Sequence, residues 1–314
     1  MGTVTVIGGA GFVGRYLVTR LAKQGNQVRV AVRDPEAAGF LKPMGGVGQV
    51  QPIQANIRNE ASIQRAVAGA DTVINLTGVM FPAGSQSFQA VHEDGAETVA
   101  RAATAAGVAR LIHVSAIGAD VEASSKYARS KAAGEAMVRA AFPDAIIVRP
   151  STIFGPEDQF FNLFARIATL SPIMPVPGDG SSRMQPVYVG DVAQAIANLV
   201  PTTAPTGGTY ELGGPQVLSL MELMAMVCEQ TGRNRLLIPV PFVFVKIKAF
   251  FLGMLPWHIL TMDQVEMLKV DNVANSDLPG LADLGVTPTA LNAILPSYLY
   301  RYRKAGRLPA TEQA

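Results

Sequence analysis

The chain has 314 residues, of which 49% are hydrophobic and 16% are charged, so it can bury one large core, or a main core and a smaller lobe. Its formal net charge is only +2, with both signs scattered along the chain, which excludes the one-signed surface typical of nucleic-acid binding. The single cysteine, Cys228, excludes a disulfide framework and is typical of a reducing compartment.

Short, nearly all-apolar segments alternate with Ala-rich helical stretches over the first half of the chain. This alternation predicts a parallel sheet with helices on both faces, a doubly wound α/β fold. The first expected strand begins at Thr3, so we expect no signal peptide or organelle leader. The expected strands are 3–7, 27–32, 50–54, 72–76, 110–114 and 145–148, and the expected helices are 12–24, 60–68, 95–106 and 125–141.

The alternation stops after Arg149-Pro150, where prolines crowd the next part of the chain. We expect a smaller C-terminal lobe to begin there, while a later helix at 187–199 and a strand at 208–212 return to the sheet. The predicted division is a main domain of residues 1–155, to which 186–213 return, and an interleaved lobe of residues 156–314.

Three glycines stand in the turn between the first expected strand and the first expected helix, at Gly8, Gly11 and Gly14. Such a turn lets backbone N–H groups and a helix N-terminus meet a pyrophosphate, because a side chain at these positions would block its approach. The alternative is an ordinary tight turn, but its place at the first strand-helix junction favours a Rossmann-type nucleotide site. We expect Phe12 and Val13, at the helix start, to contribute to it.

The second expected strand ends in Arg33-Asp34, where the adenosine ribose of a bound dinucleotide is expected. An acid there would accept from the 2′-hydroxyl of NAD, whereas a guanidinium can pair with the 2′-phosphate of NADP. Arg33 at the strand tip therefore favours NADPH, and the alternative is a solvated Arg33 with Asp34 making an NAD contact. Position alone predicts further cofactor contacts at Asn56, Ile57, Leu76, Thr77, Gly78, Ser115, Pro150 and Ile153.

Tyr127 and Lys131 stand one helical turn apart, at the start of the helix that follows the fifth expected strand. A nearby ammonium favours the phenolate, so Tyr127 could act as a general acid or base. Lys131 could also hydrogen-bond the nicotinamide ribose. A chance pair on a helix is the alternative interpretation. No metal site is expected, because His92 and His113 lack clustered ligands.

These motifs resemble those of the extended and atypical short-chain dehydrogenases/reductases, over about the first 215 residues. The matching motifs are Gly8-x-x-Gly11-x-x-Gly14, Tyr127-x-x-x-Lys131, Arg149-Pro150 and Val189-Gly190-Asp191-Val192. In active relatives a Ser or Thr near the end of the fifth strand hydrogen-bonds the substrate. Here that position falls on Ala116, one past Ser115, so the resemblance implies an incomplete triad in which Tyr127 and Lys131 are catalytically vestigial and retained for cofactor binding. The alternative is that Ser115 takes the place of the missing hydroxyl.

Further segments, spread over nearly the whole chain, resemble the NADPH-binding accessory subunits of respiratory complex I, the proton-pumping NADH:ubiquinone oxidoreductase. These segments are 43–49, 124–135, 141–150, 153–158, 185–189 and 278–286. The resemblance implies a tightly held, structural NADPH and other complex I subunits as partners. It also implies docking near the quinone site, at the junction of the peripheral and membrane arms, on the cytoplasmic face of a bacterial inner membrane or its organelle equivalent.

Two other functions stay open from the sequence: an autonomous NADPH-dependent reductase or epimerase that uses Tyr127, and an NADP redox sensor. No transmembrane span is expected, because charged residues and prolines interrupt the most apolar segment, 238–260. That segment is expected either to pack on the core or to face a partner or lipid. The aromatic and basic segment 298–304 predicts an interface or, alternatively, a solvated chain end.

Overall fold

The computed structural model describes residues 2–253 and 261–304, with side chains described in 2–247 and 261–304. The chain divides into two compact units. The first unit comprises Met1–Pro150, Val189–Leu212 and Ala274–Thr287, and the second comprises Ser151–Tyr188, Gly213–Val273 and Pro288–Ala314. The return of Ala274–Thr287 to the first unit was not expected from the sequence.

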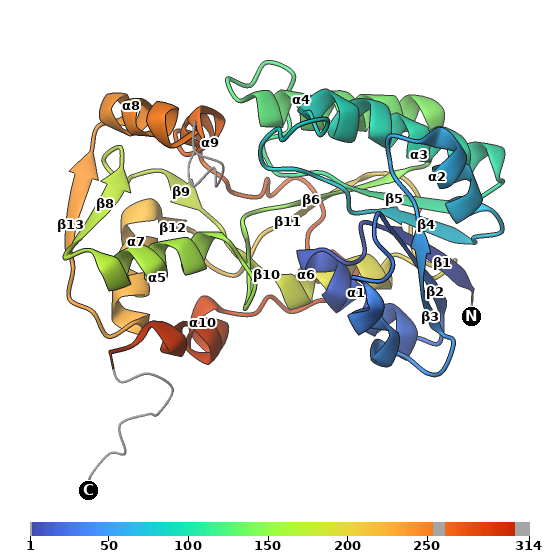
Figure 1. Cartoon of the computed structure of the whole chain (residues 1–314), viewed down its shortest axis with the longest axis horizontal. Helices are drawn as coiled ribbons and strands as arrows, with labels where there is room; N and C mark the ends of the chain where they lie inside the picture. Colours follow the sequence, from blue (N-terminus) through green and yellow to red (C-terminus); the bar gives the residue numbers. More distant parts are fainter. Residues whose placement is uncertain (1, 254–260, 305–314) are drawn as a thin grey trace, which may run out of the picture. The chain divides into compact units, whose positions relative to one another are not determined.

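The first unit is built on a seven-stranded sheet in which every pair of neighbouring strands is parallel (Figure 1). The strand order is β11-β6-β5-β4-β1-β2-β3. The strands are β1 (Thr3–Ile7), β2 (Gln27–Val32), β3 (Val50–Gln54), β4 (Thr72–Asn75), β5 (Arg110–Val114), β6 (Ile146–Pro150) and β11 (Thr209–Leu212). The predicted doubly wound parallel sheet is confirmed, including the late strand that returns to it.

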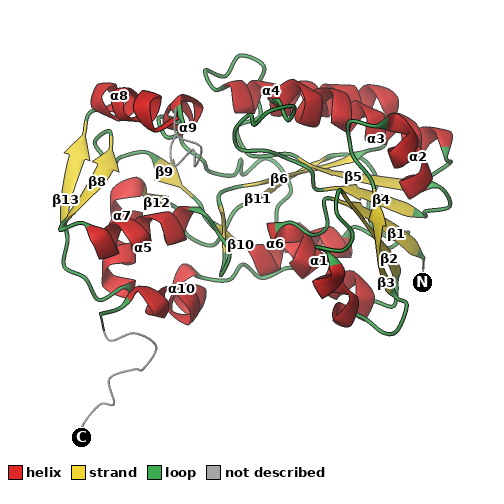
Figure 2. Ribbon diagram, viewed as in Figure 1, coloured by secondary structure: helices red, strands yellow, loops and turns green. Residues whose placement is uncertain are grey.

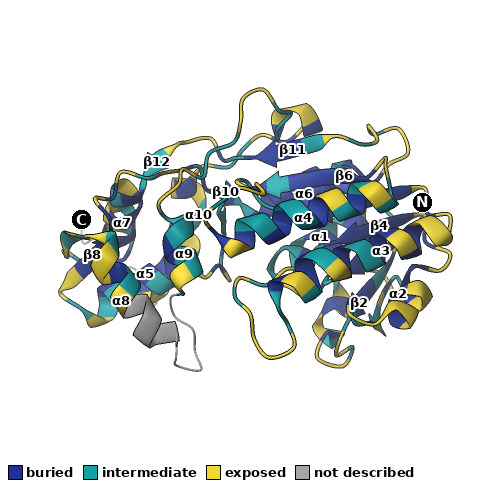
Figure 3. Cartoon of the chain, turned by 90° about the horizontal axis from the view of Figure 1, so that it is seen from above, coloured by how far each residue is buried: buried dark blue, intermediate teal, exposed yellow. Residues whose placement is uncertain are grey.

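Helices cover both faces of this sheet. Helices α1 (Phe12–Lys23) and α6 (Val189–Asn198) lie on one face, and α2 (Glu60–Val67), α3 (Asp94–Ala105) and α4 (Lys126–Ala141) lie on the other. The strands β4 and β6 are almost wholly buried between these layers (Figure 3). Burial on both faces accounts for the nearly all-apolar strands in the sequence.

Three charged side chains of the first unit form a buried network that ties together α4, β6 and β11. Arg149 donates to both carboxylate oxygens of Glu135, at 2.9 and 2.7 Å, and to Glu211 at 3.3 Å. The other oxygen of Glu211 accepts from the backbone N–H of Asn275 at 2.9 Å. This network holds the start of the Ala274–Thr287 segment against the sheet edge.

The second unit combines short two-stranded sheets with helices (Figure 2). Strand pairs are β7 (Ile153–Phe154) with β10 (Val187–Tyr188), β8 (Ile173–Pro177) with β13 (Leu236–Val240), and β9 (Arg183–Met184) with β12 (Leu218–Ser219). The helices are α5 (Phe160–Leu170), α7 (Leu220–Gln230), α8 (Phe242–Gly253), α9 (Met262–Met267) and α10 (Leu291–Leu299). Phe161, Met174 and Leu223 are fully buried in its core.

The aromatic and basic segment 298–304 is packed through its aromatic residues Tyr298 and Tyr302, whereas Arg301, Arg303 and Lys304 are exposed. The Tyr298 hydroxyl is buried and donates to Asp158 at 2.5 Å, and the Tyr302 hydroxyl donates to Asn162 at 3.0 Å. Burial is the main cause that raises the pKa of Asp158. The aromatic residues therefore attach α10 to the start of α5.

The apolar segment 238–260 contributes the end of β13 and helix α8. Val243, Phe244 and Ile247 are exposed on α8, whereas Val245 is buried. Residues 254–260 lie outside the described part of the chain. Within 2–253 and 261–304, no helix combines the length and apolar character that crossing a bilayer requires.

Candidate functional site

The glycine turn follows β1 and opens α1, as its spacing predicts. Gly8 has φ +79, a left-handed conformation that favours glycine, and its N–H donates to the Ala31 carbonyl of β2 at 3.0 Å. Gly11 is the N-cap of α1 and provides no side-chain cap. The N-terminus of α1 therefore lies at the carboxyl end of β1, and its N-cap residue supplies no side-chain acceptor to the first N–H groups.

The turn is packed so closely that side chains would not fit. A Cβ on Gly14 would collide with the Gly9 carbonyl, and a Cβ on Gly9 would come within 2.8 Å of Val30. The loop after β4 lies against Gly8, whose Cβ would be 3.4 Å from the Thr77 N. This cradle matches the shape that a pyrophosphate needs, with backbone approach kept open by glycine.

Arg33 and Asp34 lie at the carboxyl end of β2, and both are exposed. Asp34 Oδ1 accepts from the backbone N–H groups of Glu36 and Ala37, each at 3.0 Å. One oxygen of this carboxylate therefore closes the turn after β2.

Asn56 and Ile57 follow β3 and have structural contacts of their own. The Asn56 side chain accepts from Arg58 N at 3.1 Å and thereby shapes the loop. Ile57 is buried and packs at Gly95, where a Cβ would come within 2.9 Å of it. A nucleotide contact of these two residues remains a prediction.

Buried polar groups gather where β4 and β5 end, next to the glycine turn. Asn75 joins them: its Oδ1 accepts from Thr77 N at 3.0 Å, and its Nδ2 lies 3.2 Å from His113 Nδ1. Because the Asn75 amide donates to Nδ1, the proton of neutral His113 sits on Nε2. Burial, followed by the charge of Lys131, lowers the pKa of His113 to about 3.

Three buried polar atoms of this group have no hydrogen-bond partner within the described residues: Thr77 Oγ1, His113 Nε2 and Ser115 Oγ. Leaving such atoms unsatisfied is costly, so their concentration at one edge indicates a polar ligand or water there. The sequence predicted Thr77 and Ser115 as cofactor contacts, but not Asn75, which forms hydrogen bonds with Thr77 and His113. The residues at this edge therefore fit a polar cofactor such as a nicotinamide nucleotide.

Tyr127 and Lys131 both lie on the buried face of α4. Lys131 Nζ donates to the Val114 carbonyl of β5 at 3.2 Å and lies 5.9 Å from the centre of the Tyr127 ring. Burial raises the pKa of Tyr127 to about 12. The expectation that the ammonium favours the phenolate was therefore wrong, because burial dominates at this distance.

Because the pKa of Lys131 is shifted, we expect the free energy of unfolding of the nucleotide-free protein to depend on pH. Burial lowers the pKa of Lys131 from 10.5 to about 8, and Glu135 opposes the shift. Between about pH 8 and pH 10.5 the Lys131 amine is protonated in the unfolded chain but largely neutral in the folded chain. The unfolded chain therefore binds more protons, and the free energy of unfolding is expected to rise with pH, by about 1–3 kcal/mol. Urea unfolding measured between about pH 7.5 and pH 9.5 checks this, below the range in which Tyr127 ionises in the unfolded chain.

The matched control is exposed Lys126 on the same helix. Lys131→Met should remove the rise in the free energy of unfolding, whereas Lys126→Met should keep it. An equal slope in the two variants would contradict the assignment.

Leu76 follows β4, and its N–H donates to the Ile7 carbonyl at 3.0 Å. The last two predicted contacts, Pro150 and Ile153, lie in different units. Pro150 ends β6 and its carbonyl accepts from Ile117 N at 3.1 Å. Ile153 is half-buried in β7 of the second unit, paired with Val187.

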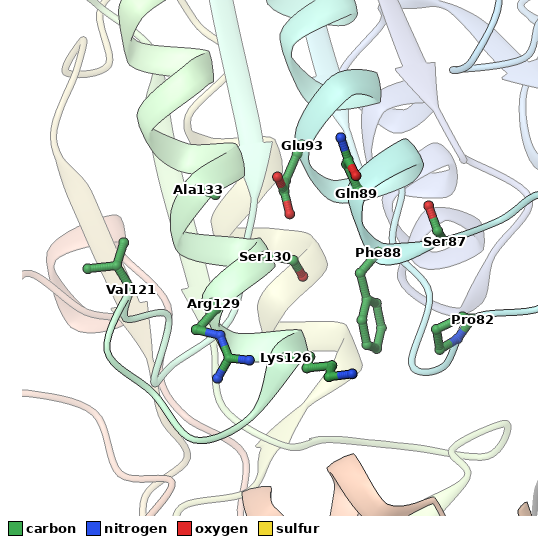
Figure 4. Close-up of a pocket in the computed structure, with 10 residues that line it drawn as sticks. All are labelled: Pro82, Ser87, Phe88, Gln89, Glu93, Val121, Lys126, Arg129, Ser130 and Ala133. Atoms are coloured by element: carbon green, nitrogen blue, oxygen red, sulfur yellow. The ribbon is translucent and has the colours of Figure 1, made fainter.

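A surface pocket of about 490 Å³ lies beside the first turns of α4 (Figure 4). It is lined by Pro82, Ser87, Phe88, Gln89, Glu93, Val121, Lys126, Arg129, Ser130 and Ala133. Of these residues, Arg129 and Ser130 belong to the helical turn that also carries Tyr127 and Lys131. Among the described residues, no group of three or more His, Cys, Asp or Glu side chains could hold a metal ion.

Comparisons with known proteins extend these observations. The model of the NAD dependent epimerase/dehydratase family matches residues 4–213. The structure of Citrobacter sp. triphenylmethane reductase complexed with NADP(H) has a TM-score of 0.75 and 22% identity, and covers 94% of this chain and 99% of that chain. At this identity, the likeness concerns the fold alone.

Two sequence relatives are more similar. The mouse protein NADH dehydrogenase (ubiquinone) 1 alpha subcomplex subunit 9, mitochondrial, is 39% identical over 302 residues, which are 95% of this chain and 80% of that protein. Ceramide reductase of Caulobacter vibrioides is 37% identical over 212 residues, 67% of this chain and 64% of that protein. Both resemblances drawn from the motifs are confirmed: the chain belongs to the NAD dependent epimerase/dehydratase family and, within it, to the family of the mitochondrial alpha subcomplex subunit 9 proteins.

Proposed function

We propose that this chain is a non-catalytic, NADPH-binding accessory subunit of respiratory complex I. The observation that carries the proposal is the 39% identity to the mouse subunit over 95% of the chain, which includes the second unit as well as the nucleotide-binding fold. The glycine cradle and the unsatisfied polar atoms at the ends of β4 and β5 support a bound nucleotide. The bound NADPH would have a structural role.

The proposed partners are the other subunits of complex I, and the proposed place is peripheral, at the junction of the two arms near the quinone site. In a bacterium this is the cytoplasmic face of the inner membrane. The exposed apolar side chains of α8, Val243, Phe244 and Ile247, are the proposed contact with lipid or with a partner.

The test is purification of the tagged chain from its own organism under mild conditions, followed by mass spectrometry of the proteins and of the nucleotide released by denaturation. Complex I subunits together with a near-equal molar amount of NADPH are the expected result. A solitary chain with an empty or freely exchanging site would overturn the proposal.

The second candidate function is an autonomous NADPH-dependent reductase, favoured by the Tyr127 and Lys131 pair and by the 37% identity to ceramide reductase. In that function Tyr127, whose raised pKa keeps it protonated, would donate the proton as general acid. The discriminating experiment is steady oxidation of NADPH with carbonyl substrates, in which Tyr127→Phe should abolish turnover. Absence of any turnover by the wild-type protein favours the accessory subunit.

Arg33 is the proposed determinant of NADPH over NADH. Charge-assisted hydrogen bonds contribute about 1.5–3 kcal/mol, so Arg33→Gln is expected to weaken NADPH binding by roughly tenfold to a hundredfold and to leave NADH binding unchanged. Calorimetric titration of the nucleotide-free protein measures both affinities. Arg65→Gln, an exposed arginine on α2, is the control, and parallel loss of both nucleotides in Arg33→Gln would contradict the assignment.

A further inference from the structure

His92 lies in a π-helical turn, η2 (Gln89–Glu93), that leads into α3. π-Helical turns are rare and frequently mark functional sites. The side chain is 2% exposed, and its ring is enclosed by Phe88, stacked at 5.4 Å, and Tyr127, edge-on at 5.4 Å. Neither the sequence motifs nor the proposed function assigns a role to this histidine.

Both ring nitrogens of His92 form hydrogen bonds, and the direction of these bonds fixes the tautomer. Val79 N–H donates to Nε2 at 3.0 Å, so the ring proton sits on Nδ1, 2.8 Å from Ser130 Oγ. Ser130 Oγ in turn donates to the Tyr127 carbonyl at 2.8 Å. One imidazole thus connects the loop after β4 to the first turns of α4.

The connected loop is the one that lies against the candidate nucleotide site. A Cβ on Gly78 would come within 3.3 Å of Lys131 Nζ and 3.6 Å of His92 Nε2. The backbone carbonyl of His92 also lies against Gly134 of α4, so closely that a Cβ there would collide with it. The position of residues 77–79 therefore depends on where His92 is held.

Only the neutral imidazole can accept from Val79 N–H. Burial, and after it the charges of Lys131 and His113, lower the pKa of His92 to about 2. The ring therefore remains an acceptor around neutral pH.

We infer that His92 is a positioning residue that holds the Thr77–Gly78–Val79 loop against α4 in the geometry that retains the nucleotide. The inference rests on the proposed nucleotide site. Phe88 and Ser130, which touch His92 directly, also line the surface pocket beside α4 (Figure 4).

The test compares His92→Phe, which keeps a flat ring but neither hydrogen bond, with His92→Gln, which can restore both an acceptor and a donor. Gln89→Ala, an exposed residue of the same turn, is the control. Two quantities are measured in the full-length chain: the dissociation rate of NADPH, followed by its fluorescence, and the hydrogen exchange rate of the Val79 amide. In His92→Phe both rates should rise about tenfold or more, and in His92→Gln and Gln89→Ala both should stay close to wild type.

Wild-type rates in His92→Phe would overturn the inference. Rates in His92→Gln as fast as those in His92→Phe would also overturn it, because the loss of ring packing alone would then explain the effect. If the wild-type chain binds no NADPH, the proposed nucleotide site fails, while exchange at Val79 still tests the role of His92. If His92→Phe does not fold, Ser130→Ala replaces it. Ser130→Ala should raise both rates, and unchanged rates would overturn the inference.

Discussion

Gly14→Ala is expected to abolish retention of the nucleotide and to lower the free energy of unfolding by about 1–3 kcal/mol. The added Cβ would collide with the Gly9 carbonyl, which belongs to the backbone and can move only with the whole turn. Replacing a helical glycine by alanine otherwise stabilises a protein by up to about 1 kcal/mol. A decrease in the free energy of unfolding would therefore indicate the collision, and an increase would indicate helix propensity alone. Nucleotide content of the purified protein and urea unfolding are the two measurements.

Gly39→Ala is the matched control, because a Cβ on Gly39 meets nothing within 4 Å. This variant should keep its nucleotide and be as stable as wild type, or slightly more so. A Gly14→Ala protein that copurifies with a full complement of NADPH would refute the cradle.

Much of the first unit could be predicted from the sequence because its signals are local. Most strands are short apolar runs, and helical periodicity appears in the segments between them, so the periodicity identifies both. The Gly8 turn is equally local, since its spacing alone places glycine where φ is positive and the backbone must come close. The second unit has no regular alternation of strands and helices, so its function was predicted only from the resemblance to known subunits.

Contacts between distant residues could not be predicted in this way. Tyr298 and Asp158 are 140 residues apart, and nothing near either of them indicates that they are paired. The same holds for the segment Ala274–Thr287, which the Glu211 carboxylate helps to hold on the first unit through Asn275. The effect of Lys131 on Tyr127 was misjudged because spacing gives proximity on a helix, but not the burial that decides a pKa.

Arg149→Met is expected to lower the free energy of unfolding by about 3–5 kcal/mol, because it leaves two carboxylates without their shared cation. The side chains of Glu135 and Glu211 are only 6% and 7% exposed, and that of Arg149 is 23% exposed. The two carboxylates, and Glu135 foremost, raise the pKa of Arg149, so the guanidinium remains charged throughout any practical pH range. Urea unfolding of the variant and of the wild-type protein gives the difference.

Arg183→Met provides the contrast, because Arg183 and its partner Asp271 are 65% and 43% exposed. Exposed ion pairs contribute about 0–1 kcal/mol, so this variant should unfold close to the wild-type midpoint. Arg149→Met should also increase hydrogen exchange around Asn275, whose N–H is held by Glu211, while exchange in α1 stays unchanged. Equal, small effects of the two substitutions would mean that the Arg149 network does not fasten α4, β6 and β11 to one another, and that apolar packing alone closes this edge of the sheet.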